Sequence, residues 1–424
     1  MNLLKTSLFT SISTGISFIC GLISIKIVAT KIGPEGISLM GQYQNVVSLF
    51  SIVATLSISV GLIKYLSERY QDKEYVNQLL NTAFITVFIG SVIAGLVSII
   101  FSTRLSLSTF HSKDLRVVFI LFGFLLILAS LNVIFSSIFN GLRQIKNLTI
   151  VTISTSIINL LLTVFLVNIF GLTGVLLASN FAAIFIFIIN IFMLKKHLKG
   201  IYKFSFSGFN LGIFKKLLSY SAMSAVTLML VPFNQFFIRD YLINNLGIVK
   251  AGYWQSVLKI SDYYLLFVTS AFSVYFLPVF SGTIDRLALK KEIFNGYKII
   301  LPAVFIMSIS IFFSRHLIIK ILFTPEFAPM ENLFLFQFLG DFFKIGSWLL
   351  GYLIAAKAMV KTMIIVEIIA NLTLVLLSRY FVSEFGIVGV TYAFALFYAV
   401  YWLGLGILIR NTVFSTKEIL PLKN

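Results

Sequence analysis

The residues best suited to chemistry in this 424-residue chain are charged side chains inside long apolar stretches. An ionised group in such surroundings is costly unless it has a partner, a water-filled cavity or a bound ligand. Three of these residues are basic and three are acidic: Lys26, Lys259, Lys344, Asp262, Asp341 and Glu367. Each is therefore a candidate functional residue.

Four of the six form two pairs of opposite charge, and the members of each pair are three residues apart. This spacing places Lys259 and Asp262 on one helix face, and likewise Asp341 and Lys344. Two interpretations stay open. Either each pair neutralises itself while lining solvent, or its members bind a substrate and a coupling ion.

The other two candidates have no such neighbour. Lys26 has no acidic residue one turn away, so it either extends to the outer lipid headgroups or binds an anion such as a phosphate. Glu367 is a candidate site for a proton or a sodium ion. The adjacent Arg239 and Asp240 close an apolar stretch, and we expect them at a membrane interface.

Proline interrupts apolar stretches in the second half of the chain. Pro232 and Pro278 each remove a backbone hydrogen bond, and a helix can bend at such a position. Both are candidate hinges, although a proline that only makes a static packing kink would give the same sequence pattern.

The composition indicates that these residues belong to a membrane protein. The chain is 59% hydrophobic and only 11% charged, whereas a soluble domain carries about 25% charged residues. Apolar runs of about 20 residues recur from end to end, which excludes a soluble enzyme. Twelve runs are predicted to cross a membrane: 6–29, 37–64, 78–101, 116–140, 148–170, 174–194, 216–238, 251–279, 297–322, 332–356, 362–381 and 387–409.

Missing motifs exclude several activities. The chain has no G-x-x-x-x-G-K-[ST] nucleotide loop and no D-x-D pair, and its three histidines lie in separate segments. The single cysteine, Cys20, cannot form a disulfide within the chain. No connection between predicted spans is long enough for a catalytic domain. We therefore expect no enzymatic activity, no cofactor and no metal.

The 33 Lys and Arg against 15 Asp and Glu give a net charge of +18. In a membrane protein such an excess marks cytoplasmic loops and contacts with anionic membrane lipids, so nucleic acid is set aside as a partner. With the N-terminus inside, 21 basic residues fall on the cytoplasmic side and 9 on the other. Both termini are therefore predicted to be cytoplasmic.

The chain also repeats itself at about half its length. Residues 170–178 match residues 385–393 at five of nine positions, and Gln44 recurs as Gln255 with a similar offset. Because each half has six spans, the halves are parallel repeats, and such repeats leave a cavity between them. The predicted segments are a first lobe, a basic cytoplasmic linker, a second lobe and a cytoplasmic tail: 1–194, 195–215, 216–410 and 411–424.

The predicted fold is an all-α integral membrane protein with 12 transmembrane helices, in two six-helix lobes around a central cavity. Transport by such parallel repeats proceeds by rocking of one lobe against the other.

Several short motifs resemble those of the Wzx-type flippases of lipid-linked oligosaccharides, in the multidrug, oligosaccharidyl-lipid and polysaccharide exporter superfamily. The resemblance covers essentially the whole chain, is strongest in its second half, and is closest to the O-antigen and enterobacterial common antigen branch. The motifs are Gly33-Pro34-Glu35-Gly36, Gly252-Tyr253-Trp254-Gln255, Ile260-Ser261-Asp262, Ala271 to Pro278, Gln337 to Lys344 with Gly346, Gly351-Tyr352 and Ala356-Lys357-Ala358.

The resemblance implies a multi-pass protein of the bacterial inner membrane that moves undecaprenyl-pyrophosphate oligosaccharide, of the O-antigen type, from the cytoplasmic to the periplasmic leaflet by alternating access. Lys26 and Lys344 match basic positions of the pattern, whereas Lys259 lies outside it. We expect these three lysines, with Gln44 and Gln255, to contact the pyrophosphate and sugars. A proton or sodium ion at Asp262, Asp341 or Glu367 would drive the return step, and polysaccharide polymerase and chain-length proteins are candidate partners.

Three alternatives stay open at this point. The first is a flippase for the lipid-linked unit of enterobacterial common antigen. The second is a multidrug cation antiporter of the same superfamily, in which uncompensated carboxylates would be expected, whereas here three lysines match three carboxylates. The third, an enzyme that polymerises or ligates lipid-linked sugars, is disfavoured because the large loop is missing.

Overall fold

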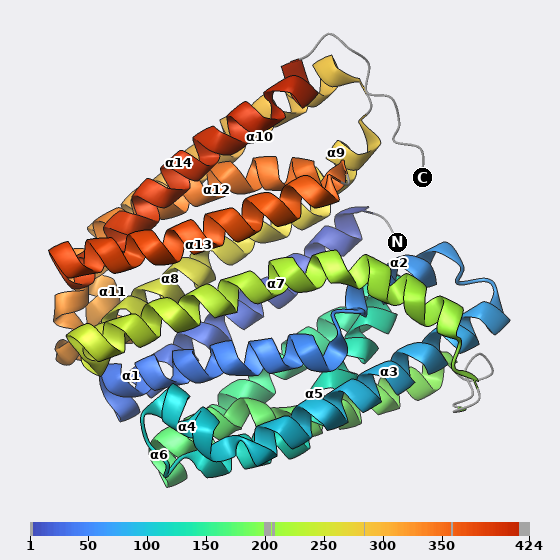
Figure 1. Cartoon of the computed structure of the whole chain (residues 1–424), viewed down its shortest axis with the longest axis horizontal. Coiled ribbons are helices and arrows are strands. Elements are labelled where there is room, and N and C mark those ends of the chain that lie inside the picture. The colour runs from blue at the N-terminus through green and yellow to red at the C-terminus, as the bar shows by residue number, and fades with distance from the viewer. Residues whose placement is uncertain (1–2, 199–204, 206–207, 284, 358, 415–424) are drawn as a thin grey trace. The chain divides into compact units, whose positions relative to one another are not determined.

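The computed structural model describes residues 3–198, 205, 208–283, 285–357 and 359–414, and every regular element in that part of the chain is helical (Figure 1). Residues 199–204 and 206–207 of the predicted linker 195–215, and residues 415–424 of the predicted tail 411–424, lie outside the described residues. A bilayer leaves peptide groups no water to bond with, so a chain this apolar crosses it as helices whose backbone bonds are internal. The all-α prediction is confirmed.

Two helices are too long for one crossing. Helix α1 (Leu3–Thr55) has 53 residues and α6 (Ile145–Leu198) has 54, whereas about 20 residues span the hydrocarbon. Each is broken once by a glycine with a positive φ, Gly33 at 63° and Gly171 at 53°. Each therefore holds two of the predicted spans.

Among the described residues, eight helices are long and apolar enough to cross a membrane, or nine if the bent helix α7 counts as one span. Counting both halves of α1 and α6, and adding the more polar run from α8 to α9, gives the twelve predicted spans. The remaining elements in chain order are α2 (Ser59–Glu68), α3 (Lys73–Ile100), α4 (Ser102–Phe110), α5 (Arg116–Gly141), α7 (Leu211–Leu246), α8 (Ile248–Ala271), a π-helix (Phe272–Phe276), α9 (Leu277–Gly282), α10 (Arg286–Phe313), α11 (Arg315–Leu322), a 3-10 helix (Pro325–Leu333), α12 (Phe334–Ala356), α13 (Val360–Phe385) and α14 (Ile387–Phe414).

Two predicted spans end earlier than expected. The second breaks at Leu56 and Ser57, which both have positive φ, and α2 continues after the break. The ninth ends with α10 at Phe313, and α11 follows as a separate short helix. The apolar composition continues through both breaks, so hydropathy alone did not locate them.

The chain forms two compact units, unit 1 (Met1–Phe236) and unit 2 (Phe237–Asn424). The division falls inside α7, one helix later than the predicted linker. In unit 1, α6 packs on α1 and α5, and α3 packs on α5 and α1. In unit 2, α14 packs on α12 and α13, and α10 packs on α12.

Small residues allow close helix packing in both units. A Cβ on Gly95 of α3 would overlap the Gly123 carbonyl of α5, and one on Gly346 of α12 would press into the Trp402 ring of α14. Apolar burial does not drive helices together within lipid, so such close backbone contact is a main source of packing energy.

The internal repeat is also present in the backbone. Gly171 and Gly386 lie 215 residues apart and have φ of 53° and 62°, and each is followed three residues later by a glycine that has no room for a side chain. At the other repeated turn, the positive φ occurs at Gly33 and Gly247, which are 214 residues apart.

The tight glycines after these turns give the first prediction. A Cβ on Gly174 would overlap the Leu166 carbonyl oxygen, and one on Gly389 would overlap that of Phe381. Gly174→Ala and Gly389→Ala should each lower stability by roughly 1–3 kcal/mol, because backbone cannot yield as a side chain does. Thermal unfolding in detergent measures this. Gly404→Ala is the control, since nothing lies within 4 Å of its Cβ position. Equal unfolding temperatures for all three variants would contradict the prediction.

Candidate functional site

The most deeply buried of the six candidate charges is Asp341 of α12, which has no exposed surface. Tyr264 of α8 donates its Oη to Asp341 Oδ2 at 2.9 Å, and Gln337 donates its Nε2 to Oδ1 at 3.4 Å. The Tyr264 Oη also lies 3.3 Å from the Ser308 hydroxyl of α10. Polar groups from three helices of unit 2 therefore meet around this carboxylate.

Lys344 lies one turn after Asp341 but is stabilised differently. Its Nζ lies 4.9 Å from the centroid of the Trp348 ring and 5.9 Å from that of Phe394. Within the described part of the chain, no ion pair of 4 Å or less joins Lys344 to Asp341. Ring faces attract a cation without taking up its N–H donors, so this half-buried ammonium can still bind an anion.

The second spaced pair lies on α8. Lys259 is half-buried and Asp262 is exposed. In the described residues no ion pair within 4 Å joins them either. Spacing by three residues therefore did not produce a close ion pair in either case, although it places both members on one helix face. The roles of both residues stay predictions.

Arg239 of α7 was expected at a membrane interface, and the structure instead buries it completely. Its Nη2 donates a hydrogen bond to Gln255 Oε1 of α8, and its guanidinium lies 5.5 Å from the Trp254 ring centroid. Gln255, a predicted substrate ligand, is only 4% exposed. A buried cation beside Gln255 was missed because Arg239 stands near the end of an apolar stretch, where hydropathy cannot distinguish an interface from a core.

Glu367 of α13, predicted as an ion site, is bound by neutral donors. Tyr401 of α14 donates its Oη to Glu367 Oε1 at 3.0 Å, and Asn371 donates its Nδ2 to Oε2 at 3.2 Å. The cluster lies in unit 2, as does Asp341, but on different helices.

In unit 1, the predicted ligands Lys26 and Gln44 both lie on α1 and both are exposed. Their backbone carbonyls accept hydrogen bonds of 2.8 Å from Thr30 and Ser48. Both residues are therefore accessible, and their roles as substrate ligands stay predictions.

The candidate hinges lie beside irregular helix. Helix α7 bends by 50° between Leu211–Ser219 and Ser224–Leu246, so the bend precedes the buried Pro232 by about three turns. Pro278 stands in the first turn of α9, directly after the π-helix Phe272–Phe276. A π-helix shifts the hydrogen-bond ladder by one residue and often marks functional sites. Hinge motion at either proline stays a prediction.

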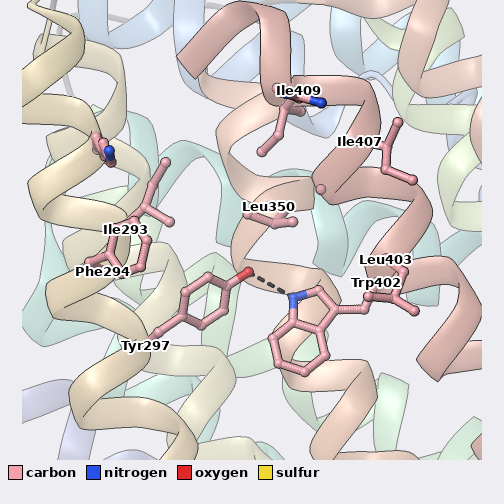
Figure 2. Close-up of a pocket in the computed structure, with 11 residues that line it drawn as sticks. Ile293, Phe294, Tyr297, Leu350, Trp402, Leu403, Ile407 and Ile409 are labelled. Carbon is pink, nitrogen blue, oxygen red and sulfur yellow. Dashed lines mark hydrogen bonds between the residues drawn. The ribbon is translucent and has the colours of Figure 1, made fainter. Parts of the chain in front are cut away.

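An apolar groove of about 690 Å³ runs between α10, α12 and α14 (Figure 2). Trp402 donates its Nε1 to Tyr297 Oη at 2.9 Å, and Tyr297 donates to the Gly346 carbonyl at 3.0 Å. The remaining lining is mainly aliphatic and aromatic, with Lys290 and Arg410 near the start of α10 and the end of α14. Such a lining suits hydrocarbon chains.

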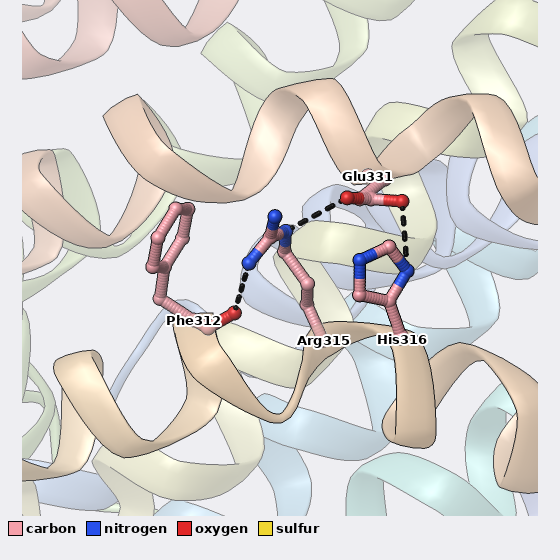
Figure 3. Close-up of polar contacts among 4 residues, drawn as sticks. All are labelled: Phe312, Arg315, His316 and Glu331. Atoms are coloured by element: carbon pink, nitrogen blue, oxygen red, sulfur yellow. Dashed lines mark hydrogen bonds and ion pairs between the residues drawn. The ribbon is translucent and has the colours of Figure 1, made fainter.

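A separate ion-pair cluster joins α11 to the 3-10 helix (Figure 3). Glu331 accepts from Arg315 Nε at 2.9 Å, and its second oxygen lies 3.1 Å from His316 Nδ1. Arg315 also donates to the Phe312 carbonyl at 2.9 Å. These partially exposed contacts connect α11 to the 3-10 helix. They lie outside the candidate site.

The Asp341 cluster gives the second prediction. Tyr264→Phe removes the shortest hydrogen bond to a fully buried carboxylate, and a buried group that loses its donor costs about 1–3 kcal/mol. The unfolding temperature in detergent should therefore fall. Tyr380→Phe is the matched control, because Tyr380 is 61% exposed. The role assigned to Tyr264 is wrong if the two variants have the same unfolding temperature.

Comparison with known proteins finds a matching family and relatives of similar length. The family model described as polysaccharide biosynthesis protein matches residues 3–284. The lipid III flippases of Escherichia coli (strain K12) and Shigella flexneri are each 26% identical over 404 residues, covering 95% of this chain and 97% of theirs.

Solved structures share the fold at low identity. A multidrug resistance MATE family transporter of the MOP superfamily, in an inward-facing conformation, matches with a TM-score of 0.81 and 14% identity over 93% of this chain and 94% of its own. A MOP superfamily transporter from Pyrococcus furiosus matches with a TM-score of 0.74 and 14% identity over 97% and 96%.

The apolar helices identify a multi-pass membrane protein, and its fold is the one seen in MOP superfamily transporters. Since the family model matches well over half of the sequence, the chain belongs to the polysaccharide biosynthesis protein family.

Proposed function

We propose that this protein is a lipid-linked oligosaccharide flippase of the bacterial inner membrane. It moves an undecaprenyl-pyrophosphate oligosaccharide of the O-antigen type from the cytoplasmic to the periplasmic leaflet by alternating access. The observation that carries the proposal is the likeness to lipid III flippases over nearly the full length of both chains. Enterobacterial common antigen units are the alternative substrate.

The chemistry of unit 2 supports an anionic substrate. Lys344 lies in a membrane-spanning helix and is held by aromatic rings rather than by a carboxylate. A compact ammonium in that setting suits a diphosphate. A multidrug cation antiporter would instead favour carboxylates without compensating lysines, whereas three lysines match the three intramembrane carboxylates here.

The third prediction tests the substrate assignment. Lys344→Ala should slow translocation of a polyprenyl-diphosphate oligosaccharide in proteoliposomes by about tenfold or more, because a charge-assisted contact contributes about 1.5–3 kcal/mol. Lys344→Arg should retain part of the activity if charge dominates. Lys361→Ala, at an exposed position outside α12, is the control. Wild-type rates in Lys344→Ala would remove this lysine from the binding site.

The same cluster supports ion coupling at Asp341. The carboxylate accepts hydrogen bonds from Tyr264 and Gln337, and in the described residues Gln337 Oε1 and Ser261 Oγ are buried without a hydrogen-bond partner. A proton would neutralise this buried carboxylate, and a sodium ion would take such oxygen atoms as ligands. Asp262 is exposed and Glu367 is half-buried, whereas Asp341 is fully buried, where a change of charge has the largest effect, so Asp341 is the strongest of the three predicted coupling residues.

The fourth prediction separates coupling from binding. Asp341→Asn keeps the shape of the side chain but loses its charge, so translocation should become insensitive to an imposed proton or sodium gradient. Substrate binding to the purified protein should stay within about twofold of wild type. Asp240→Asn is the control for loss of a carboxylate elsewhere in unit 2. A variant that still responds fully to both gradients would exclude Asp341 as the coupling residue.

A further inference from the structure

Unit 1 contains a groove whose lining is unusual for a membrane-spanning bundle. The groove has a volume of about 500 Å³ and lies between α2, α5 and α6. Eight of its fifteen lining residues carry an amide or a hydroxyl group, and none carries a charge. Both α5 and α6 are apolar enough to cross the membrane, so these polar groups lie along helices that lipid would otherwise surround.

Some of the polar groups are satisfied within their own helix. Asn159 donates its Nδ2 to the Thr155 carbonyl at 2.8 Å, and Thr155 donates to the Val151 carbonyl at 2.8 Å. Others are not: within the described residues, the side chains of Ser136, Asn140 and Ser179 have no hydrogen-bond partner, although all three line the groove. An unsatisfied amide or hydroxyl facing lipid costs roughly 1–3 kcal/mol. The groove is therefore suited to water or to a polar ligand.

The second half of the chain shows that the fold itself does not require this polarity. The turn glycines Gly171 and Gly386 relate the two units by an offset of 215 residues. At that offset Thr155, Asn159 and Ser179 become Ala370, Leu374 and Phe394. At the same offset Ala129 and Val133 become Lys344 and Trp348, so the corresponding surface of unit 2 carries a charge and an aromatic ring where unit 1 has a neutral polar lining.

The chemistry of the lining restricts the ligand. A diphosphate or a cationic drug needs an opposite charge, and the groove has none. A hydrocarbon chain would leave the free amide and hydroxyl groups unsatisfied. Sugar hydroxyls both donate and accept hydrogen bonds, as these side chains do, and aliphatic lining residues such as Val151 and Ile186 can pack on the C–H face of a sugar ring.

We propose that this groove of unit 1 is a carbohydrate subsite, in which Ser136, Asn140 and Ser179 hydrogen-bond neutral sugar residues of the lipid-linked oligosaccharide. The inference rests on the proposed flippase function for its substrate. It separates the binding of sugar, in unit 1, from the binding of diphosphate at Lys344, in unit 2.

The fifth prediction uses a triple variant, Ser136→Ala with Asn140→Ala and Ser179→Ala. Two probes are compared in proteoliposomes: a polyprenyl diphosphate carrying one sugar, and the same lipid carrying an oligosaccharide. Loss of three hydrogen bonds should slow the oligosaccharide probe by about tenfold and leave the one-sugar probe within about twofold. The matched control replaces three exposed polar residues of unit 2: Asn245→Ala, Thr373→Ala and Ser383→Ala.

Equal slowing of both probes, or wild-type rates for both, would overturn the subsite and leave the flippase function standing. A wild-type protein that moves neither probe would instead refute the proposed function.

A binding measurement tests the subsite without translocation. In a Cys20→Ser background, Ser136→Cys places a single thiol in the groove. A membrane-impermeant maleimide should label this thiol, and the free oligosaccharide should slow the labelling by about fivefold or more. A thiol that does not react in the folded protein, or that reacts equally fast with and without oligosaccharide, contradicts the proposal.

Discussion

The structure depends first on the rule that no peptide group in the hydrocarbon can stay without a hydrogen bond. Helices meet this rule along their whole length, and the chain departs from regular helix only at particular residues. Gly33, Gly171 and Gly386 turn the chain with a positive φ, which glycine adopts without a steric penalty. Two tight glycines just beyond such turns then let neighbouring backbones approach. The twelve spans and the repeat between the units follow from these few positions.

A common backbone carries different chemistry in the two units. Unit 2 concentrates the charge, with Asp341 held by a tyrosine and a glutamine and Lys344 held by two rings. Unit 1 instead carries a neutral polar groove, and the positions of unit 2 that the repeat relates to it include Lys344 with Trp348 and Phe394. A lipid-linked oligosaccharide has matching parts, since it joins hydrocarbon, an anionic diphosphate and neutral sugars. Separate surfaces of fixed polarity avoid placing any of these parts against a group it cannot satisfy.

Residue spacing along a helix did not predict which charges form ion pairs. Opposite charges three residues apart on a helix are near one another on average, yet neither Asp341 with Lys344 nor Lys259 with Asp262 forms a close ion pair. In a low-dielectric interior a charge is stabilised by whichever groups surround it in three dimensions, and Tyr264 reaches Asp341 from another helix. Arg239 illustrates the same limit, because its partner Gln255 belongs to the following helix.

The sequence by itself determined the fold class, the number of spans, the repeat and the set of intramembrane charges. These properties depend on composition and on residue order along one helix, which hydropathy and spacing record directly. Only the tertiary structure decided which candidate charge is sealed in a core, which one lies against aromatic rings, and that uncharged Ser136, Asn140 and Ser179 share one groove. Those outcomes depend on side chains from helices far apart in the chain. The residue spacing within one helix does not determine how that helix is rotated against its neighbours.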